Sequence, residues 1–173
     1  NGYPIGVIAG KKKYMDYFIH PDPQKRVLIA GTFNAHPVTN IAAITTLKKL
    51  ASSTFQVYEH VEKLGKMLED GLKQIFGKYD FPYHIARERS AFCVYFMDHA
   101  PQDFHDILTH HNFEVDTEFR LNLIKQGVFN FPNPTKQGSI SYAHSENDIE
   151  ETLDKTKKVL QSLLDKKPKL IKS

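Results

Sequence analysis

The chain has 173 residues, of which 40% are hydrophobic and 25% charged, and its formal net charge is +3. Its length and composition suit a globular protein with its own core. The longest apolar runs, "PIGVIAG" and "VLIAG", are far too short to cross a bilayer. The weak charge, without a basic stripe and interleaved stacking aromatics, argues against a nucleic-acid surface. We therefore expect neither a membrane nor a nucleic acid as partner.

The first 50 residues alternate short apolar runs with loops. Residues 4–9 and 27–30 are predicted strands, and residues 11–19 are predicted to form a short helix or turn. Pro37 begins a predicted helix, since its missing N–H costs nothing in the first turn. Two short strands and one helix cannot close a core alone, so residues 1–50 are interpreted as the edge of a larger domain.

Residues 51–173 show clearer periodicity. Helices are predicted at 55–76, 102–111 and 117–126 and from Ser145 onward, and strands at 83–97, 128–131 and 139–143. Residues 83–97 fit one strand, or two with a break near "RERS". Gly77 and Gly127 are expected to end their helices, and Ser145 with Asp148 is a variant of the capping box. This order predicts a small α/β sandwich with helices on one side of a sheet.

The stretch "AGTFNAHP" is a candidate anion site. Gly31 ends a predicted strand, Thr32 brings a hydroxyl, and Pro37 begins a helix whose dipole favours an anion at its N-terminus. The same residues also fit an ordinary turn in which a Thr or Asn caps the helix. The residues alone leave both interpretations open.

The histidines and the single cysteine suggest no further chemistry. His105 and His110 are separated by five positions rather than the four that would align them on a helix, so no metal site is predicted. Cys93 lies in "AFCVYF", a predicted buried strand, and is interpreted as a core residue. One cysteine allows no internal disulfide, and a reducing compartment, the cytoplasm, is expected.

Three stretches together suggest a family: "NGYPIGVIAGKKKYMD", "AGTFNAHPVTNIAAITTLKKL" and "GVFNFPNPTKQGSISYAHSENDIEETL". They resemble the C-terminal part of class III pyridoxal-phosphate-dependent aminotransferases, most closely the glutamate-1-semialdehyde aminomutase branch. The resemblance implies an α/β fold of the fold type I transferases. It makes residues 1–50 a remnant of the large cofactor-binding domain and residues 51–173 the small C-terminal domain.

The same resemblance implies a site. Gly31, Thr32 and Phe33 would contact the phosphate of pyridoxal phosphate across the interface of a homodimer, whose active site is shared between subunits. The lysine that binds the cofactor would lie just before Asn1. No catalytic residue is then expected within the chain, and the chain alone is expected to be inactive. The other partners would be a small-molecule amino donor and acceptor.

Two departures from the branch bear on the substrate. Ala35 stands where the branch usually has glycine, which removes freedom at positive φ. Lys136 stands in a loop where the branch tends to have an acidic residue, so it is a candidate substrate contact or a solvated loop lysine. If this loop faces the substrate, a cation in place of an anion would change which end of the substrate is accepted, so a keto acid, a β-keto thioester or a sugar-like substrate becomes an alternative to glutamate 1-semialdehyde. The alternative functions are an aminotransferase domain of a modular synthase and a non-catalytic dimerisation module.

Overall fold

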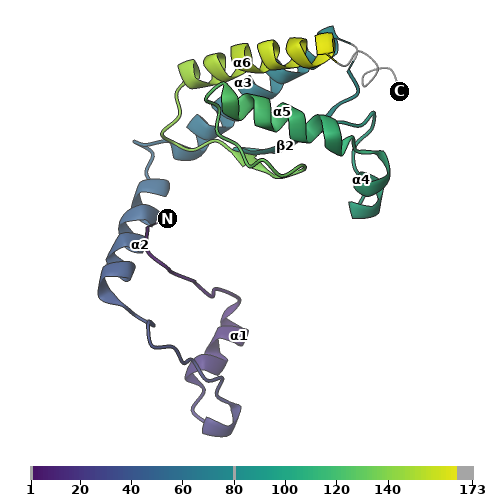
Figure 1. Cartoon of the computed structure of the whole chain (residues 1–173). Helices are drawn as coiled ribbons and strands as arrows, with labels where there is room; N and C mark the ends of the chain where they lie inside the picture. Colours follow the sequence, from purple (N-terminus) through teal and green to yellow (C-terminus); the bar gives the residue numbers. More distant parts are fainter. Residues whose placement is uncertain (1, 80, 167–173) are drawn as a thin grey trace. The chain divides into compact units, whose positions relative to one another are not determined.

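The computed structural model describes residues 2–79 and 81–166 (Figure 1). The chain divides into two compact units, the first unit Asn1–Phe55 and the second unit Gln56–Ser173. Each is described by itself. Among the described residues, no helix combines the length and the apolar character that crossing a membrane requires.

The first unit consists of short helices joined by extended segments. Its elements are α1 (Lys12–Met15), the 3-10 helices η1 (Asp16–Ile19) and η2 (Pro23–Lys25), and α2 (Pro37–Leu50). The helical turn predicted for residues 11–19 is confirmed by α1 and η1. None of the described residues of this unit is buried. This agrees with the expectation that residues 1–50 cannot close a core alone.

The strands predicted at 4–9 and 27–30 are wrong for this structure. Both segments lack strand structure, because a strand needs a neighbour with which to exchange hydrogen bonds. In the second segment, Val27 N–H instead donates to the Tyr17 carbonyl at 2.9 Å. Among the described residues of the first unit, neither segment gains a strand partner.

The second unit is an α/β sandwich, as predicted. It contains α3 (Val57–Lys78), β1 (His84–Glu88), β2 (Ala91–Tyr95), α4 (Phe104–His110), α5 (Phe113–Lys125), β3 (Gly138–Ser139) and α6 (Glu146–Lys166). The sheet is antiparallel in the order β1-β2-β3, with Ile85 opposite Val94 and Ala91 opposite Ser139. Helix α6 packs against α3 and α5, and α3 also contacts β1 (Figure 1).

The core of the second unit forms where these helices meet the sheet. The apolar stripe of α3 supplies Leu64 and Phe76, which are fully buried. The ring of Phe96, just after β2, lies edge-on to Phe76 and Phe119 with centroids 5.9 and 5.3 Å away. Such edge-to-face aromatic pairs add to the burial of apolar area. Residues 83–97 thus form two strands around a turn, the second alternative read from the sequence.

Helix ends agree with prediction in part. Gly127 adopts φ 81°, and its N–H and that of Val128 donate to the Ile124 and Leu123 carbonyls, so this glycine ends α5. Helix α3 instead continues through Gly77 to Lys78, so the prediction for Gly77 is wrong. Gly77 keeps a helical backbone, at a cost of about 1 kcal/mol, because the adjoining turn buries Phe76 in the core.

The capping box predicted at Ser145 forms, whereas the strand predicted at 128–131 does not. Ser145 Oγ accepts from Asp148 N–H at 3.3 Å, and Asp148 Oδ2 accepts from Ser145 N–H at 2.7 Å, which confirms the box. Residues 128–131 do not form a strand. Their carbonyl groups at Val128 and Phe131 accept from the side chains of Asn130 and Arg120, so they are not available to a sheet. Strand β3 is Gly138–Ser139, so of the strand predicted at 139–143 only Ser139 pairs in the sheet.

Candidate functional site

The predicted anion site forms a double turn in the first unit. Asn34 N–H donates to the Gly31 carbonyl at 3.1 Å, and His36 N–H donates to the Phe33 carbonyl at 3.3 Å. Gly31, Thr32 and Phe33 therefore lie together in one turn directly before α2. All three residues are exposed within the described chain.

Ala35 completes this turn in a conformation that suits glycine. Its φ is 57°, in the left-handed region, which costs a residue with a Cβ roughly 1–2 kcal/mol. The glycine common in the resembling branch would adopt it without that cost.

The cap of α2 bears on the capping role that Thr32 or Asn34 would have in an ordinary turn. Pro37 occupies the first helical position, and His36 Nδ1 accepts from Thr39 N–H at 3.5 Å. Because His36 takes the capping position, Thr32 is not the cap. The Thr32 hydroxyl has no hydrogen-bond partner among the described residues, so it remains able to donate to a ligand.

The second unit contains a cavity of about 360 Å³. Part of its lining is apolar and includes Leu68, Leu72 and Phe119. Cys93 and Lys136 also lie on the lining. The cavity lies among α3, α5, α6 and the sheet.

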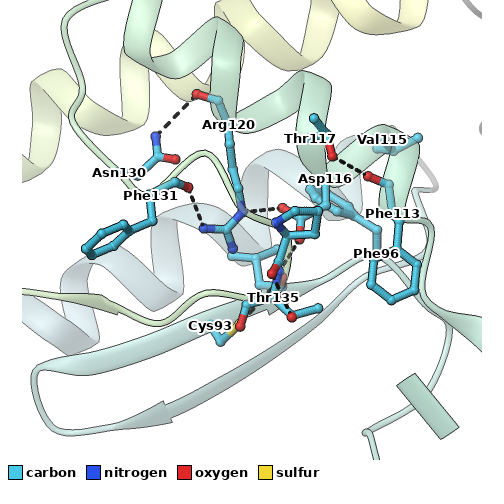
Figure 2. A network of polar contacts seen from close by, with 12 residues as sticks. Cys93, Phe96, Phe113, Val115, Asp116, Thr117, Arg120, Asn130, Phe131 and Thr135 are labelled. Carbon is cyan, nitrogen blue, oxygen red and sulfur yellow. Dashed lines mark hydrogen bonds and ion pairs between the residues drawn. The ribbon is translucent and has the colours of Figure 1, made fainter. Parts of the chain in front are cut away.

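Asp116 is the centre of a buried polar network beside this cavity (Figure 2). Its side chain is 1% exposed, and it accepts from Arg120 Nε at 2.6 Å and from Thr135 N–H at 2.7 Å. Arg120 Nη1 also donates to the Phe131 carbonyl at 3.2 Å. The network ties α5 to the loop before β3, and the opposite charges of Asp116 and Arg120 compensate each other.

His111 completes this network in a defined protonation state. Phe96 N–H donates to His111 Nδ1 at 3.1 Å, so Nδ1 carries a lone pair. The proton of the neutral ring then lies on Nε2, which is 3.1 Å from Asp116 Oδ2 and donates to it. The histidine orients the carboxylate without adding charge.

Cys93 is a core residue, as expected. It is 8% exposed, and its Sγ donates to the Thr135 carbonyl at 3.4 Å. Burial raises the pKa of the thiol above its ordinary value. A thiol held in its neutral form is a poor nucleophile, so the structure gives Cys93 no catalytic role.

Lys136 lies where its charge is not compensated. It is exposed, it lines the cavity, and its ammonium has no partner among the described residues. Three residues of the lining belong to the types Lys, Arg, Asp and Glu: Asp116, Arg120 and Lys136. Asp116 and Arg120 pair with each other, so Lys136 is left without an opposite charge on the lining. Lys136 belongs to the second unit and Thr32 to the first, so each is described within its own unit.

Sequence reasoning missed the buried network. The spacing of Asp116 and Arg120, four positions apart, is typical of an ion pair on a helix surface. Nothing local in the sequence indicates that His111, Thr135 and the Phe131 carbonyl bury this pair, because these partners come from other segments.

No family model matches the chain. A glutamate-1-semialdehyde 2,1-aminomutase from Staphylococcus aureus (strain JH9) is 32% identical over 152 residues, which is 88% of this chain and 34% of that enzyme. An omega-transaminase from Sphaerobacter thermophilus matches in structure with a TM-score of 0.75 and 23% identity, over 92% of this chain and 36% of the other. A transaminase with PLP bound matches with a TM-score of 0.72 and 21% identity, over 91% and 35%.

The fold is therefore that of part of a pyridoxal-phosphate-dependent transaminase of fold type I, as the resemblance predicted. In sequence, the chain is similar to the C-terminal region of glutamate-1-semialdehyde 2,1-aminomutase, which confirms the predicted resemblance to that branch of the class III enzymes. The chain spans about a third of the length of the curated relatives it matches.

Proposed function

We propose that the protein containing this chain is a pyridoxal-phosphate-dependent aminotransferase or aminomutase acting on a keto or semialdehyde substrate. The observation that carries the proposal is the 32% identity to a glutamate-1-semialdehyde 2,1-aminomutase over 88% of the chain. The matching fold of two transaminases supports it. None of these matches favours a modular synthase or a non-catalytic module.

In this chain, the turn of Gly31, Thr32 and Phe33 would hold the phosphate of the cofactor. A phosphate needs hydrogen-bond donors and a positive potential, and the turn offers the Thr32 hydroxyl next to the N-terminus of α2. This donor set fits the group. When bound, pyridoxal phosphate supplies an electron sink for the substrate carbon that loses a proton. The Thr32 hydroxyl would bind the phosphate and so orient the cofactor.

Lys136 is proposed as a substrate contact that favours a negatively charged group. Its ammonium is exposed at the cavity, and the nearby charges of Asp116 and Arg120 cancel. An uncompensated cation attracts a carboxylate and disfavours an ammonium. We also propose, from the resemblance, a cytoplasmic homodimer in which the Thr32 turn serves the site of the partner subunit.

The full-length protein should isomerise glutamate 1-semialdehyde, or transfer its amino group to a keto acid, in the presence of pyridoxal phosphate. Product formation followed by mass spectrometry tests this. The 173-residue chain alone is the negative control, since it spans a third of the relatives' length. The proposal would be overturned if the full-length protein neither isomerises glutamate 1-semialdehyde nor transfers an amino group to a keto acid.

Thr32→Ala in the full-length protein should weaken cofactor binding while the fold persists. One hydroxyl donated to a charged phosphate contributes roughly 1.5–3 kcal/mol, which is on the order of tenfold to a hundredfold in Kd. Titration with pyridoxal phosphate measures the loss. Thr46→Ala is the matched control, because the Thr46 hydroxyl donates to the Ala42 carbonyl within α2. A lower Tm with unchanged Kd would assign Thr32 to the turn alone.

Lys136→Glu should change which substrate is accepted and leave cofactor affinity as it is. Reversal of one charge near a site should lower kcat/KM for acidic substrates at least tenfold and raise it for substrates with an added ammonium. Lys125→Glu, at the exposed end of α5, controls for the net charge of the protein. The same loss in both variants would show that Lys136 is only a solvated loop residue.

A further inference from the structure

We infer that His99, Asp106 and His110 form a binding site for a divalent transition metal ion such as Zn²⁺, at the edge of the second unit. His99 lies in the loop after β2, and the other two residues belong to α4. One ligand atom from each lies within 4.8 Å of the other two. The inference does not depend on the proposed function.

The spacing of the three ligand atoms suits a metal ion. His99 Nε2 is 3.0 Å and His110 Nδ1 is 2.8 Å from Asp106 Oδ1. Around a tetrahedral zinc ion with bonds of about 2.0–2.2 Å, neighbouring ligand atoms are separated by roughly 3.3 Å. The two separations from Asp106 Oδ1 therefore need to open by only a few tenths of an ångström to admit an ion, and the two histidine nitrogens lie within 4.8 Å of each other. Two imidazoles and one carboxylate are ligands that zinc accepts.

A second layer of contacts orients these ligands. Asp98 Oδ1 is 2.6 Å from His99 Nδ1, so this carboxylate holds a proton on Nδ1 and leaves Nε2 for a metal. Gln102 N–H donates to Asp106 Oδ2 at 2.9 Å, and Oδ1 is the oxygen that lies nearest to both histidines. A carboxylate on the far nitrogen of a ligand histidine is the usual support of a zinc site.

The backbone holds the ligands in place. Asp106 and His110 are four positions apart and share one face of α4. Asp103 caps this helix by accepting from Asp106 N–H at 2.8 Å. The side chains of His99, Asp106 and His110 are 38%, 14% and 50% exposed, so an ion can enter from solvent and keep a water as its fourth ligand. Such an ion would tie the loop after β2 to α4.

From the sequence, His105 and His110 are the candidate histidine pair on this helix, and no metal is predicted because their spacing does not align them. The helical pair is Asp106 and His110, and the third ligand comes from the preceding loop. Among the described residues, no other His, Cys, Asp or Glu group of three comes as close together.

Titration of the whole chain with Zn²⁺ and with Ni²⁺ at neutral pH, followed by calorimetry, tests the site. We expect one ion per chain. His99→Ala, His110→Ala and Asp106→Asn should each weaken binding at least tenfold, and Asp98→Asn should weaken it about 10–100-fold through the orientation of His99. X-ray absorption on the zinc-loaded chain should show two imidazole ligands.

His105→Ala is the matched control, because His105 is an exposed histidine of the same helix outside the cluster. It should bind the ion as the unchanged chain does. Loss in His105→Ala equal to that in His110→Ala would show adventitious binding by surface histidines. Binding that survives His99→Ala, or the absence of one-to-one binding in the unchanged chain with its far-UV circular dichroism intact, would also overturn the inference.

Discussion

Asp116 and Arg120 show how burial changes what an ion pair contributes to stability. Lys66 and Asp70 have the same helical spacing on α3, but their side chains are 65% and 50% exposed. Exposed pairs of this kind contribute about 0.3–0.5 kcal/mol. Asp116 instead has three donors around it, His111, Arg120 and the Thr135 backbone, and its side chain is only 1% exposed.

Asp116→Ala should lower the free energy of unfolding by about 3–5 kcal/mol, because it leaves the buried guanidinium of Arg120 without its partner. Asp70→Ala, which breaks the exposed pair, should change it by less than about 0.5 kcal/mol. Urea unfolding of both variants measures the difference. Equal losses would mean that the buried network contributes no more than a surface pair.

The residue scale also marks what the sequence could predict of the site. The Thr32 turn could be predicted because its glycine, hydroxyl and proline lie within seven residues of each other, whereas its role in phosphate binding stays a prediction. Cys93 was predicted correctly because a continuous apolar run indicates burial. The Asp116 network and the His99 cluster were missed because their members come from separate segments, and only the fold brings them together.

At the scale of elements, helices were easier to predict than strands. The stripe of α3 and the capping box of α6 are local, and both elements formed as expected. A strand depends on a neighbour that local sequence does not specify. Residues 4–9 and 27–30 are apolar enough for strands but have no strand partner among the described residues of the first unit. Residues 128–131 have carbonyls that side chains occupy.

Arg87 joins β1 to α3 and should make stability depend on pH. Its Nε donates to Glu69 at 2.7 Å and its Nη2 to Glu62 at 3.0 Å. Lys73 and then Arg87 hold the pKa of Glu69 below its ordinary value, and Arg87 does so for Glu62. Because the folded pKa values are the lower ones, these carboxylates stabilise the fold above the ordinary pKa of Glu, and the effect is lost as pH falls through the lowered values.

Arg87→Gln should therefore flatten the acid side of the stability profile. The unchanged chain should lose free energy of unfolding steadily as pH falls below about 5, and the variant should lose less over the same range. Urea midpoints at a series of pH values give both slopes. Parallel profiles would show that the contacts of Arg87 with α3 do not contribute to acid sensitivity.

For the whole molecule, stability should be concentrated in the second unit. All buried residues of the described chain lie between Val61 and Leu163, whereas the first unit exposes apolar side chains such as Ile41 and Leu47 on α2. Burial of apolar surface is the main favourable term in folding. The two units should therefore open with very different free energies.

Hydrogen exchange on the whole chain tests this expectation. Amides of α3 and β2 should exchange slowest, and those of residues 2–26 should exchange within the first time points. Mass spectrometry of peptides from one sample compares the two directly, at a single pH and temperature. Comparable protection in residues 2–26 would contradict the division of stability, unless a partner chain covers them.

The burial of Cys93 has a practical consequence for watching this protein unfold. It is the single cysteine of the sequence, it lies at the centre of β2, and its raised pKa keeps the sulfur unreactive. A thiol reagent should then modify the folded chain slowly and react much faster when the sheet separates from its helices. The rate of modification then reports how often the sheet opens, and no cysteine has to be introduced by substitution. Slow labelling in native buffer, accelerating with urea in step with the loss of helix, is the expected pattern.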